Sequence, residues 1–259
     1  EDLRRRGGRL ILRKGDPRQV LPRVVAESGA AAVFAEEDVS PYARDSDRTL
    51  QKRVPLTLTP GLMIAPPGEI TKKDGDPYQV YSYYMRTWKD RYLPVQVQNV
   101  LPAPDRVETP DGIRSSVDLP SASTPAVVEH FAPGAQEASN RLERFVGGQV
   151  PDIYRYSVSR DRPDLGQTSR LSPYFHFGML SVREAVAGAM AAKRQAETAV
   201  EREGVDTWIE ELIWRDFYLS ILYHFPDVMH GSFREAFADL PWRNDRGEFQ
   251  RWKEGKTGY

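Results

Sequence analysis

The first hundred residues alternate short apolar runs with amphipathic segments. The apolar runs read as strands at residues 9–13, 31–34 and 62–64. The first helix between them is marked by Asp16-Pro17 before its apolar stripe and by Ser28-Gly29 after it. A second helix is expected near residues 45–53. Strands that alternate with helices predict a parallel sheet of the doubly wound type.

Downstream of this region the pattern changes twice. Prolines recur between positions 102 and 133 and leave no room for a long helix or a central strand. From residue 135 the chain reads as helical, with helices at 135–146 and 182–202. Capping boxes at Ser181, Thr207 and Ser232 mark further helix starts. The sequence therefore predicts an α/β domain at 1–100, a connector at 101–134 and an all-α domain at 135–259.

The run from Trp208 to Phe225 is apolar on almost every side, so its helix must be buried nearly all round. At helical spacing, one face gathers Trp208, Glu211, Trp214, Arg215 and Tyr218. A carboxylate and a guanidinium among indoles are costly to desolvate. This face is either a structural ion pair beside core aromatics, which is the commoner arrangement, or the wall of a pocket for a flavin or a nucleobase.

Residues 156–178 supply a second candidate site. Thr168 and Ser169 are hydroxyl donors in a loop, and Ser172-Pro173 begins a short helix. Together with Arg170 and free backbone N–H groups, this helix start could cradle a phosphate. An ordinary capped turn is the alternative, and the local pattern alone favours it.

Composition narrows the class of protein. The chain of 259 residues contains no Cys, which removes disulfides and thiolate chemistry and is compatible with a reducing cytoplasm. A formal net charge of −1 argues against bulk electrostatic binding of nucleic acid, although a local basic patch would serve a site-specific enzyme. The His residues lack metal-ligand spacing, and no apolar run is long enough to cross a bilayer. We expect a cytoplasmic protein without a metal site or a membrane partner.

Three ordered segments are far more specific. Residues 168–178 (TSRLSPYFHFG) resemble the flavin-binding signature of the DNA photolyase/cryptochrome family, and residues 211–218 (ELIWRDFY) resemble its second signature. A third signature is similar to residues 252–259 (WKEGKTGY), while residues 40–45 and 76–81 resemble elements of the family's α/β antenna domain. The chain is most like a cyclobutane pyrimidine dimer photolyase of class I type. The resemblance implies an internal piece, without the family's first strand and the last helices of its flavin domain.

The resemblance also implies site residues, with FAD as cofactor and damaged DNA as partner. FAD would contact Tyr156, Thr168, Ser169, Arg170, Leu171, Ser172, Trp208 and Arg215. Arg160 would contact the DNA backbone, and Tyr218 would lie near the lesion. Glu211 would hydrogen-bond a flipped-out dimer and Trp214 would stack on it, which makes these two the implied catalytic residues. Trp242 would be the surface member of an electron-transfer chain.

The implied activity is light-driven repair of pyrimidine dimers by a deoxyribodipyrimidine photo-lyase, a carbon–carbon lyase, acting as a monomer. The alternative is a cryptochrome-type blue-light photoreceptor without repair activity, because the flavin signature does not separate the two. A chain that lacks part of the flavin pocket could also be inert by itself. Pro41-Tyr42 stands where folate-binding members carry an Asn-Glu pair, so a deazaflavin or a second flavin is expected as antenna chromophore before a folate, if one is bound.

Overall fold

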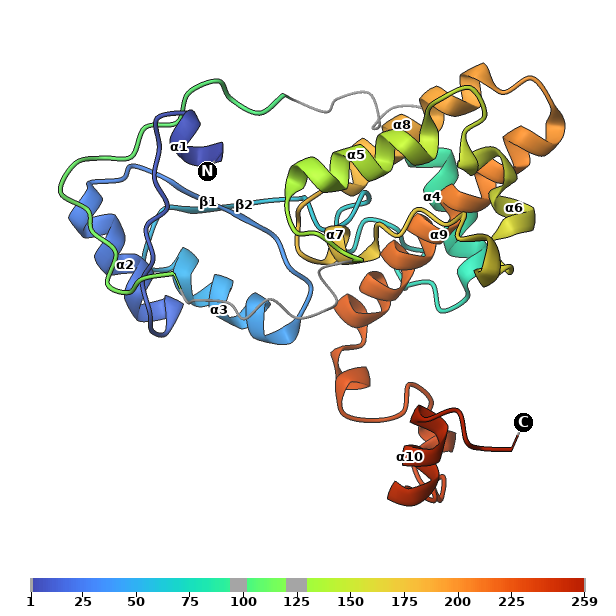
Figure 1. The fold of residues 1–259 in the computed structure, drawn as a ribbon. Helices are drawn as coiled ribbons and strands as arrows, with labels where there is room; N and C mark the ends of the chain where they lie inside the picture. The colour runs from blue at the N-terminus through green and yellow to red at the C-terminus, as the bar shows by residue number, and fades with distance from the viewer. Residues whose placement is uncertain (1, 94–101, 120–129, 259) are drawn as a thin grey trace. The chain divides into compact units, whose positions relative to one another are not determined.

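A computed structural model describes residues 2–93, 102–119 and 130–258, in two compact units, Glu1–His224 and Phe225–Tyr259 (Figure 1). Part of the expected connector at 101–134 lies outside the described residues. The first unit contains α1 (Asp2–Arg5), α2 (Pro17–Ser28), β1 (Val33–Glu36), α3 (Pro41–Gln51), β2 (Leu56–Thr59), α4 (Tyr81–Tyr92), α5 (Ala135–Val146), η2 (Asp152–Arg155), α6 (Tyr156–Ser159), η3 (Pro163–Leu165), α7 (Ser172–His176), α8 (Val182–Gln195) and α9 (Ala199–His224). The second unit contains η4 (Pro226–Met229), η5 (Glu235–Phe237) and α10 (Arg246–Lys253).

The N-terminal elements build a small parallel sheet. β1 and β2 run side by side, with Val33 opposite Leu56 and Glu36 opposite Thr59, and α3 connects them. The sheet and the helices after it confirm the expected fold class, an α/β part followed by a helical part. The described sheet has two strands, fewer than a doubly wound domain suggests. The sequence interpretation omits β2, a four-residue strand that is too short for a distinct alternation.

The strand predicted at residues 9–13 is wrong. The Arg9 N–H donates to the Thr109 hydroxyl at 2.8 Å, and the Leu12 N–H donates to the Ser115 hydroxyl at 3.0 Å. Side-chain oxygens therefore satisfy backbone groups that a neighbouring strand would otherwise satisfy.

The strand predicted at residues 62–64 is wrong for a related reason. The N–H groups of Ile64 and Ala65 both donate to the carboxylate of Asp216, at 3.0 and 3.1 Å. Because the acceptor is a single buried carboxylate on α9, the segment turns around it instead of extending along a sheet.

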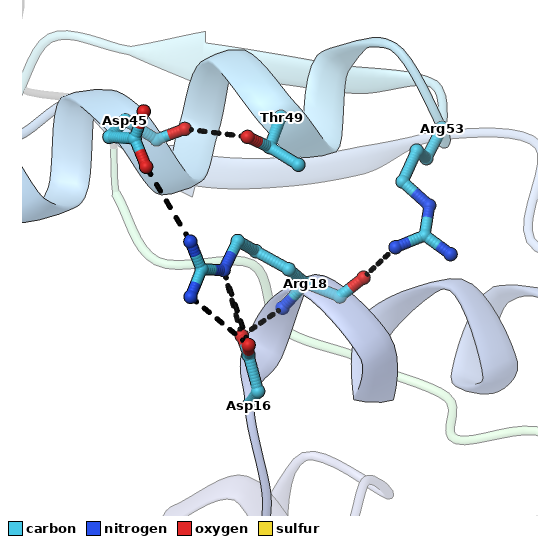
Figure 2. A network of polar contacts seen from close by, with 5 residues as sticks. All are labelled: Asp16, Arg18, Asp45, Thr49 and Arg53. Atoms are coloured by element: carbon cyan, nitrogen blue, oxygen red, sulfur yellow. Dashed lines mark hydrogen bonds and ion pairs between the residues drawn. The ribbon is translucent and has the colours of Figure 1, made fainter.

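Helix α2 begins and ends as predicted. The Asp16 side chain accepts from the backbone N–H of Arg18 at 2.9 Å, Pro17 occupies the first turn, and Gly29 ends the helix with a φ of 64°. The same Asp16 carboxylate pairs with the Arg18 guanidinium, which also reaches the carboxylate of Asp45 at 3.5 Å (Figure 2).

Helix α3 carries that second partner. The Arg53 guanidinium, which follows α3, donates to the backbone carbonyl of Arg18 at 2.5 Å, so the contacts drawn in Figure 2 hold α2 against α3. Ser40 caps α3 by accepting from the Ala43 N–H at 3.4 Å. The helix therefore begins at Pro41, before the expected position near residue 45.

Helix α9 begins further upstream than predicted. Thr207 lies inside the helix, where its hydroxyl donates to the carbonyl of Glu203 at 2.8 Å, so the capping box placed there is wrong. The capping box that opens α9 is formed by Thr198 and Glu201. The Thr198 hydroxyl accepts from the Glu201 N–H at 3.2 Å, and the Glu201 carboxylate accepts from the Thr198 N–H at 3.0 Å. Consequently α8 ends at Gln195 and not near residue 202.

Helix α4 is absent from the sequence interpretation, because Val80 before it provides no side-chain cap. It carries Tyr84, Trp88 and Tyr92 into the main hydrophobic core, together with buried residues of α5, α8 and α9. Residues before position 100 thus share one core with residues after position 135. The predicted domain boundaries themselves stay predictions.

The second unit is simpler. The Ser232 box does not open an α-helix; the residues after it form only the short η5, while α10 is capped by Asp245. No helix in the described part of the chain combines the length and the hydropathy that crossing a bilayer requires.

Candidate functional site

One cavity of about 550 Å³ is lined by both segments that the sequence singles out. Its walls come from the segment after β2, α6, the loop before α7, α7 itself and α9. They consist of Leu62, Tyr156, Thr168, Ser169, Arg170, Leu171, Ser172, Phe175, His176, Trp208, Glu211, Leu212, Arg215 and Leu219. All eight residues expected to contact FAD are in this set, and Glu211 lies beside them.

Trp208 joins the two walls. Its side chain is buried, it packs against Phe145 at 5.2 Å between ring centroids, and its indole N–H donates to the Ser169 hydroxyl at 3.3 Å. Leu171 is also buried and anchors the middle of the loop. The polar ends of Thr168, Arg170 and Ser172 stay exposed along the cavity rim.

The loop meets α7 without an ordinary cap. No side-chain hydrogen bond caps α7, and Arg170 adopts a left-handed backbone with a φ of 51°. The capped turn, which the local pattern favours, is therefore not the observed arrangement. The hydroxyls of Ser169 and Ser172 and the guanidinium of Arg170 belong to residues that line the cavity, and such groups suit a diphosphate. The start of α7 adds little to them, because Pro173 has no N–H and the N–H groups of Tyr174 and Phe175 donate to the Leu171 carbonyl at 3.0 and 3.1 Å.

Arg215 is fixed on the opposite wall. Its guanidinium donates to the carbonyl of Leu62, and it lies 3.9 Å from the carboxylate of Asp216. Burial lowers the pKa of Arg215, against the opposing effect of Asp216. The guanidinium still stays protonated at neutral pH, because arginine starts from a very high value. It adds a fixed positive charge to the cavity.

Glu211 reaches the cavity edge from α9. Its carboxylate pairs with the Arg160 guanidinium at 2.5 Å, and about a third of each side chain is exposed (36% and 37%). Arg160 also lies 6.0 Å above the ring of Tyr156. Burial, followed by the charge of Glu211, raises the pKa of the Tyr156 hydroxyl. The Glu211–Arg215 pair that helical spacing favours is therefore wrong: Glu211 pairs with Arg160, and Arg215 contacts Leu62 and Asp216.

The predicted face of α9 divides into two groups. Trp208, Glu211 and Arg215 line the cavity, whereas Trp214 and Tyr218 are not among its described lining residues. The indole of Trp214 stacks on Tyr81 of α4 at 3.5 Å between centroids, and Tyr218 lies 5.5 Å from it. Trp242 belongs to the second unit, where 72% of it is exposed.

Sequence reasoning missed one buried acid. Asp216 has no exposed surface, and one carboxylate oxygen accepts from Ile64, Ala65 and the indole N–H of Trp88 at 3.0–3.1 Å. Burial raises the pKa of Asp216 to about 6, against the opposing effects of these donors and of Arg215. The signal in the sequence is an acid on the apolar side of a helix that is buried nearly all round.

Comparison with known sequences identifies the family. A sequence model described as DNA photolyase matches residues 1–105, and one described as the FAD binding domain of DNA photolyase matches residues 208–259. The chain is 35% identical to a deoxyribodipyrimidine photo-lyase of Halobacterium salinarum over 98% of its own length and 54% of that protein's length. The chain thus spans about half the length of that curated relative.

Comparison with solved structures agrees on the fold. A bacterial class III photolyase from Agrobacterium tumefaciens superposes with a TM-score of 0.85, at 24% identity, over all of this chain and 54% of the other. A cryptochrome from Synechocystis gives a TM-score of 0.73, at 18% identity, over all of this chain and 55% of the other. Both sequence models and the similarity to a curated photo-lyase over nearly the whole chain show that the chain belongs to the DNA photolyase family.

Proposed function

We propose that the cavity between α7 and α9 holds part of an FAD molecule. The observation that carries this proposal is that both signature segments line one cavity. Ser169, Arg170 and Ser172 would hold the diphosphate, because hydroxyls and a guanidinium are suited to a doubly charged group. Trp208 would lie along the flat apolar part, and Arg215 would face its polar edge.

We further propose that the protein repairs cyclobutane pyrimidine dimers in DNA, as the name of the Halobacterium relative suggests. Reduced FAD, when bound, supplies the electron that light transfers. Glu211 would hydrogen-bond the flipped-out dimer, and in its protonated form it would donate to the negative charge that develops there, an effect that grows in a site from which water is excluded. Arg160 would bind the DNA backbone, and Trp242 would be a surface relay for photoreduction.

The energetics of lesion capture fit this assignment. Extruding a base from the stack costs a few kcal/mol, and less for a lesion that already pairs poorly. Stacking on an aromatic ring returns about 1–3 kcal/mol per base. Trp214 is half-buried at the surface of α9 and would supply that stacking, with Tyr218 nearby. The presence of both Glu211 and Trp214 is the reason for proposing a class I enzyme whose preferred lesion is the pyrimidine dimer.

Illumination tests the repair proposal. The native-length protein, with its flavin reduced, should remove dimers from an oligonucleotide under near-ultraviolet or blue light and leave them in the dark. Glu211→Gln should retain FAD and dimer binding but repair fewer dimers per absorbed photon. Trp214→Ala should bind the dimer more weakly while keeping FAD. An unchanged dimer content in the illuminated wild-type sample would eliminate the proposal.

A cryptochrome-type photoreceptor without repair is the second candidate, and the similarity of the fold to the Synechocystis protein favours keeping it. Binding in the dark separates the two. A photolyase should prefer a duplex with a dimer to an intact duplex, whereas a photoreceptor without repair should bind the two alike. An absorbance spectrum of the 259-residue chain tests whether this length retains flavin, since an inert chain would show no flavin band.

An antenna chromophore would absorb additional light. We propose a deazaflavin or a second flavin before a folate, because Pro41-Tyr42 replaces the Asn-Glu pair of folate-binding members. A smaller cavity of about 280 Å³ beside α3, lined in part by Asp38, Arg44 and Arg48, offers charged groups for such a ligand. Chromophore released from the denatured native-length protein can be identified by its mass. We also propose a cytoplasmic monomer, in keeping with a DNA substrate and a chain free of cysteine.

A further inference from the structure

Trp214 is held by a neighbour from outside its own helix. The ring of Tyr81, at the start of α4, lies 3.5 Å from the indole centroid with an angle of 5° between the planes. Phe217 supports both rings edge-on, at 5.9 Å from Tyr81 and 5.7 Å from Trp214. α4 and α9 lie side by side here (Figure 1).

Polar contacts fix Tyr81 as well. Its hydroxyl donates to the backbone carbonyl of Glu210 at 3.0 Å, on the helical turn that carries Glu211 and Trp214. The side chain of the same Glu210 accepts from Lys89 of α4 at 2.7 Å. Burial raises the pKa of the Tyr81 hydroxyl, so it stays a donor at physiological pH. The Tyr81 ring that stacks on Trp214 is therefore also held to α9 by the hydrogen bond of its hydroxyl.

The other face of the indole is covered differently. The Tyr218 ring lies 5.5 Å from Trp214 with an angle of 23°, an offset stack. Because Tyr81 fills one face at van der Waals distance, we infer that Tyr218 covers the opposite face. Tyr218 is 63% exposed, so it can turn away into solvent. One face of Trp214 is thus stacked closely on Tyr81, and the exposed Tyr218 ring covers the other less closely.

We propose that Tyr81 is a positioning residue for Trp214. It holds the indole plane so that the face under Tyr218 can accept a flat base, and Tyr218 turns aside when a base arrives. This role rests on the proposed function. The physical reason is that the outer torsion of a Trp side chain is broad, and a ring that is already fixed loses less freedom when a ligand stacks on it.

The first test follows the indole itself. In native-length protein labelled with 5-fluorotryptophan, Trp214→Phe assigns the fluorine resonance of Trp214. Tyr81→Leu should broaden or split that resonance, whereas Tyr81→Phe should keep it narrow because the stacked ring remains. Tyr83→Leu, at an exposed tyrosine of the same helix, should leave it unchanged. A narrow, unshifted Trp214 resonance in Tyr81→Leu would overturn the proposal.

The second test follows DNA in the dark. Tyr81→Leu should weaken binding of a dimer-containing duplex about tenfold. Binding of the intact duplex, and the flavin content, should not change. Tyr81→Phe should restore most of the lost affinity, which a general folding defect would not allow. Equal dimer affinity in Tyr81→Leu and wild type would contradict the role of Tyr81 alone, while a wild-type protein that binds both duplexes alike would contradict the proposed function and this role with it.

Discussion

The carboxylate of Glu211 has two proposed partners that it cannot hold at once. In the structure it pairs with Arg160, whereas the proposed repair would require it to face the dimer. Both side chains are about one-third exposed, and an ion pair of this kind stabilises by about 1 kcal/mol or less. Under the proposed function, a DNA phosphate would therefore draw Arg160 away and release Glu211. The pair would keep the acid in place until DNA arrives.

This exchange predicts the effect of Arg160→Gln on DNA binding. If Arg160 neutralises one phosphate, the slope of log K against log salt concentration should become less steep by about 0.9. Dimer-containing and intact duplexes should be affected alike, because a backbone contact carries no information about the lesion. Titrations of both duplexes at several salt concentrations measure this. A variant that loses affinity only for the dimer would show that Arg160 reads the lesion.

Asp216 predicts an unusual dependence of stability on pH. Burial raises its pKa to about 6 in the folded chain, above the value of 3.8 for a free carboxyl. Because the folded state binds this proton more tightly, Asp216 adds stability below pH ~4 that is lost as the pH rises through about 6. A shift of about two units corresponds to about 3 kcal/mol.

Comparison with Asp216→Asn isolates this contribution from that of the other carboxyls. The free energy of unfolding of the wild type minus that of the variant should fall by about 2.4 kcal/mol between pH 4 and pH 7, because at pH 4 the unfolded carboxyl is already partly ionised. Urea unfolding at several pH values measures the difference. A difference that rises with pH would mean that the three N–H donors and Arg215 outweigh burial and lower the pKa of the acid.

At the scale of elements, substitution by alanine should have opposite effects on stability at two glycines within helices. A Cβ on Gly204 of α9 would lie 2.4 Å from the carbonyl oxygen of Tyr154 and 2.5 Å from that of Ile153, both backbone atoms of η2. A Cβ on Gly188 of α8 would meet only the side chains of Val146 and Leu142, at 3.5 Å or more. The first helix contact therefore needs glycine, and the second does not.

Gly204→Ala should destabilise the chain by about 1–3 kcal/mol, because α9 must move off η2 and the wall of the cavity with it. Gly188→Ala should be neutral or stabilising by up to about 1 kcal/mol, since alanine favours a helix over glycine. Urea unfolding of the two variants beside the wild type gives both values. Equal effects of the two substitutions would show that α9 does not need this close approach.

How far the sequence predicts these elements depends on whether their signals are local. α2 was predictable because Asp16, Pro17 and Gly29 each act within one turn of the helix. The strand predicted at 62–64 failed because its backbone donors are satisfied by Asp216, 151 and 152 positions away in sequence. α4 was missed because packing in the core stabilises it and no capping residue marks its start in the sequence.

The candidate site divides in the same way. Helical spacing placed Trp208, Glu211 and Arg215 on one face, and all three line the cavity. Spacing along one helix could not show that Trp214 would be covered by Tyr81, because that contact joins two helices. Helical spacing also could not identify the ion-pair partner of Glu211. Arg160 and Arg215 carry the same charge, and Arg215 is closer to Glu211 in sequence. Tertiary contacts decided both.

At the scale of the whole molecule, one hydrophobic core contains residues from both of the domains that the sequence predicts, 1–100 and 135–259. Trp88 of α4 is fully buried, and its indole N–H donates to Asp216 of α9. Residues of α4, α5, α8 and α9 belong to the same cluster, whereas α10 is in the second unit and has no buried residue. The helices α4, α5, α8 and α9 should therefore unfold as one cooperative body, independent of α10.

Hydrogen exchange on the 259-residue chain can detect this cooperativity. Trp88→Leu removes a buried indole and should cost about 3 kcal/mol, which corresponds to exchange on the order of 100-fold faster for amides that open only on global unfolding. The increase should appear alike in α4, α5, α8 and α9 and be absent from α10. Trp252→Leu in α10, at a 67% exposed position, should leave the first unit unchanged. Faster exchange confined to α4 would mean that the residues before position 100 open separately from the helices that carry the cavity.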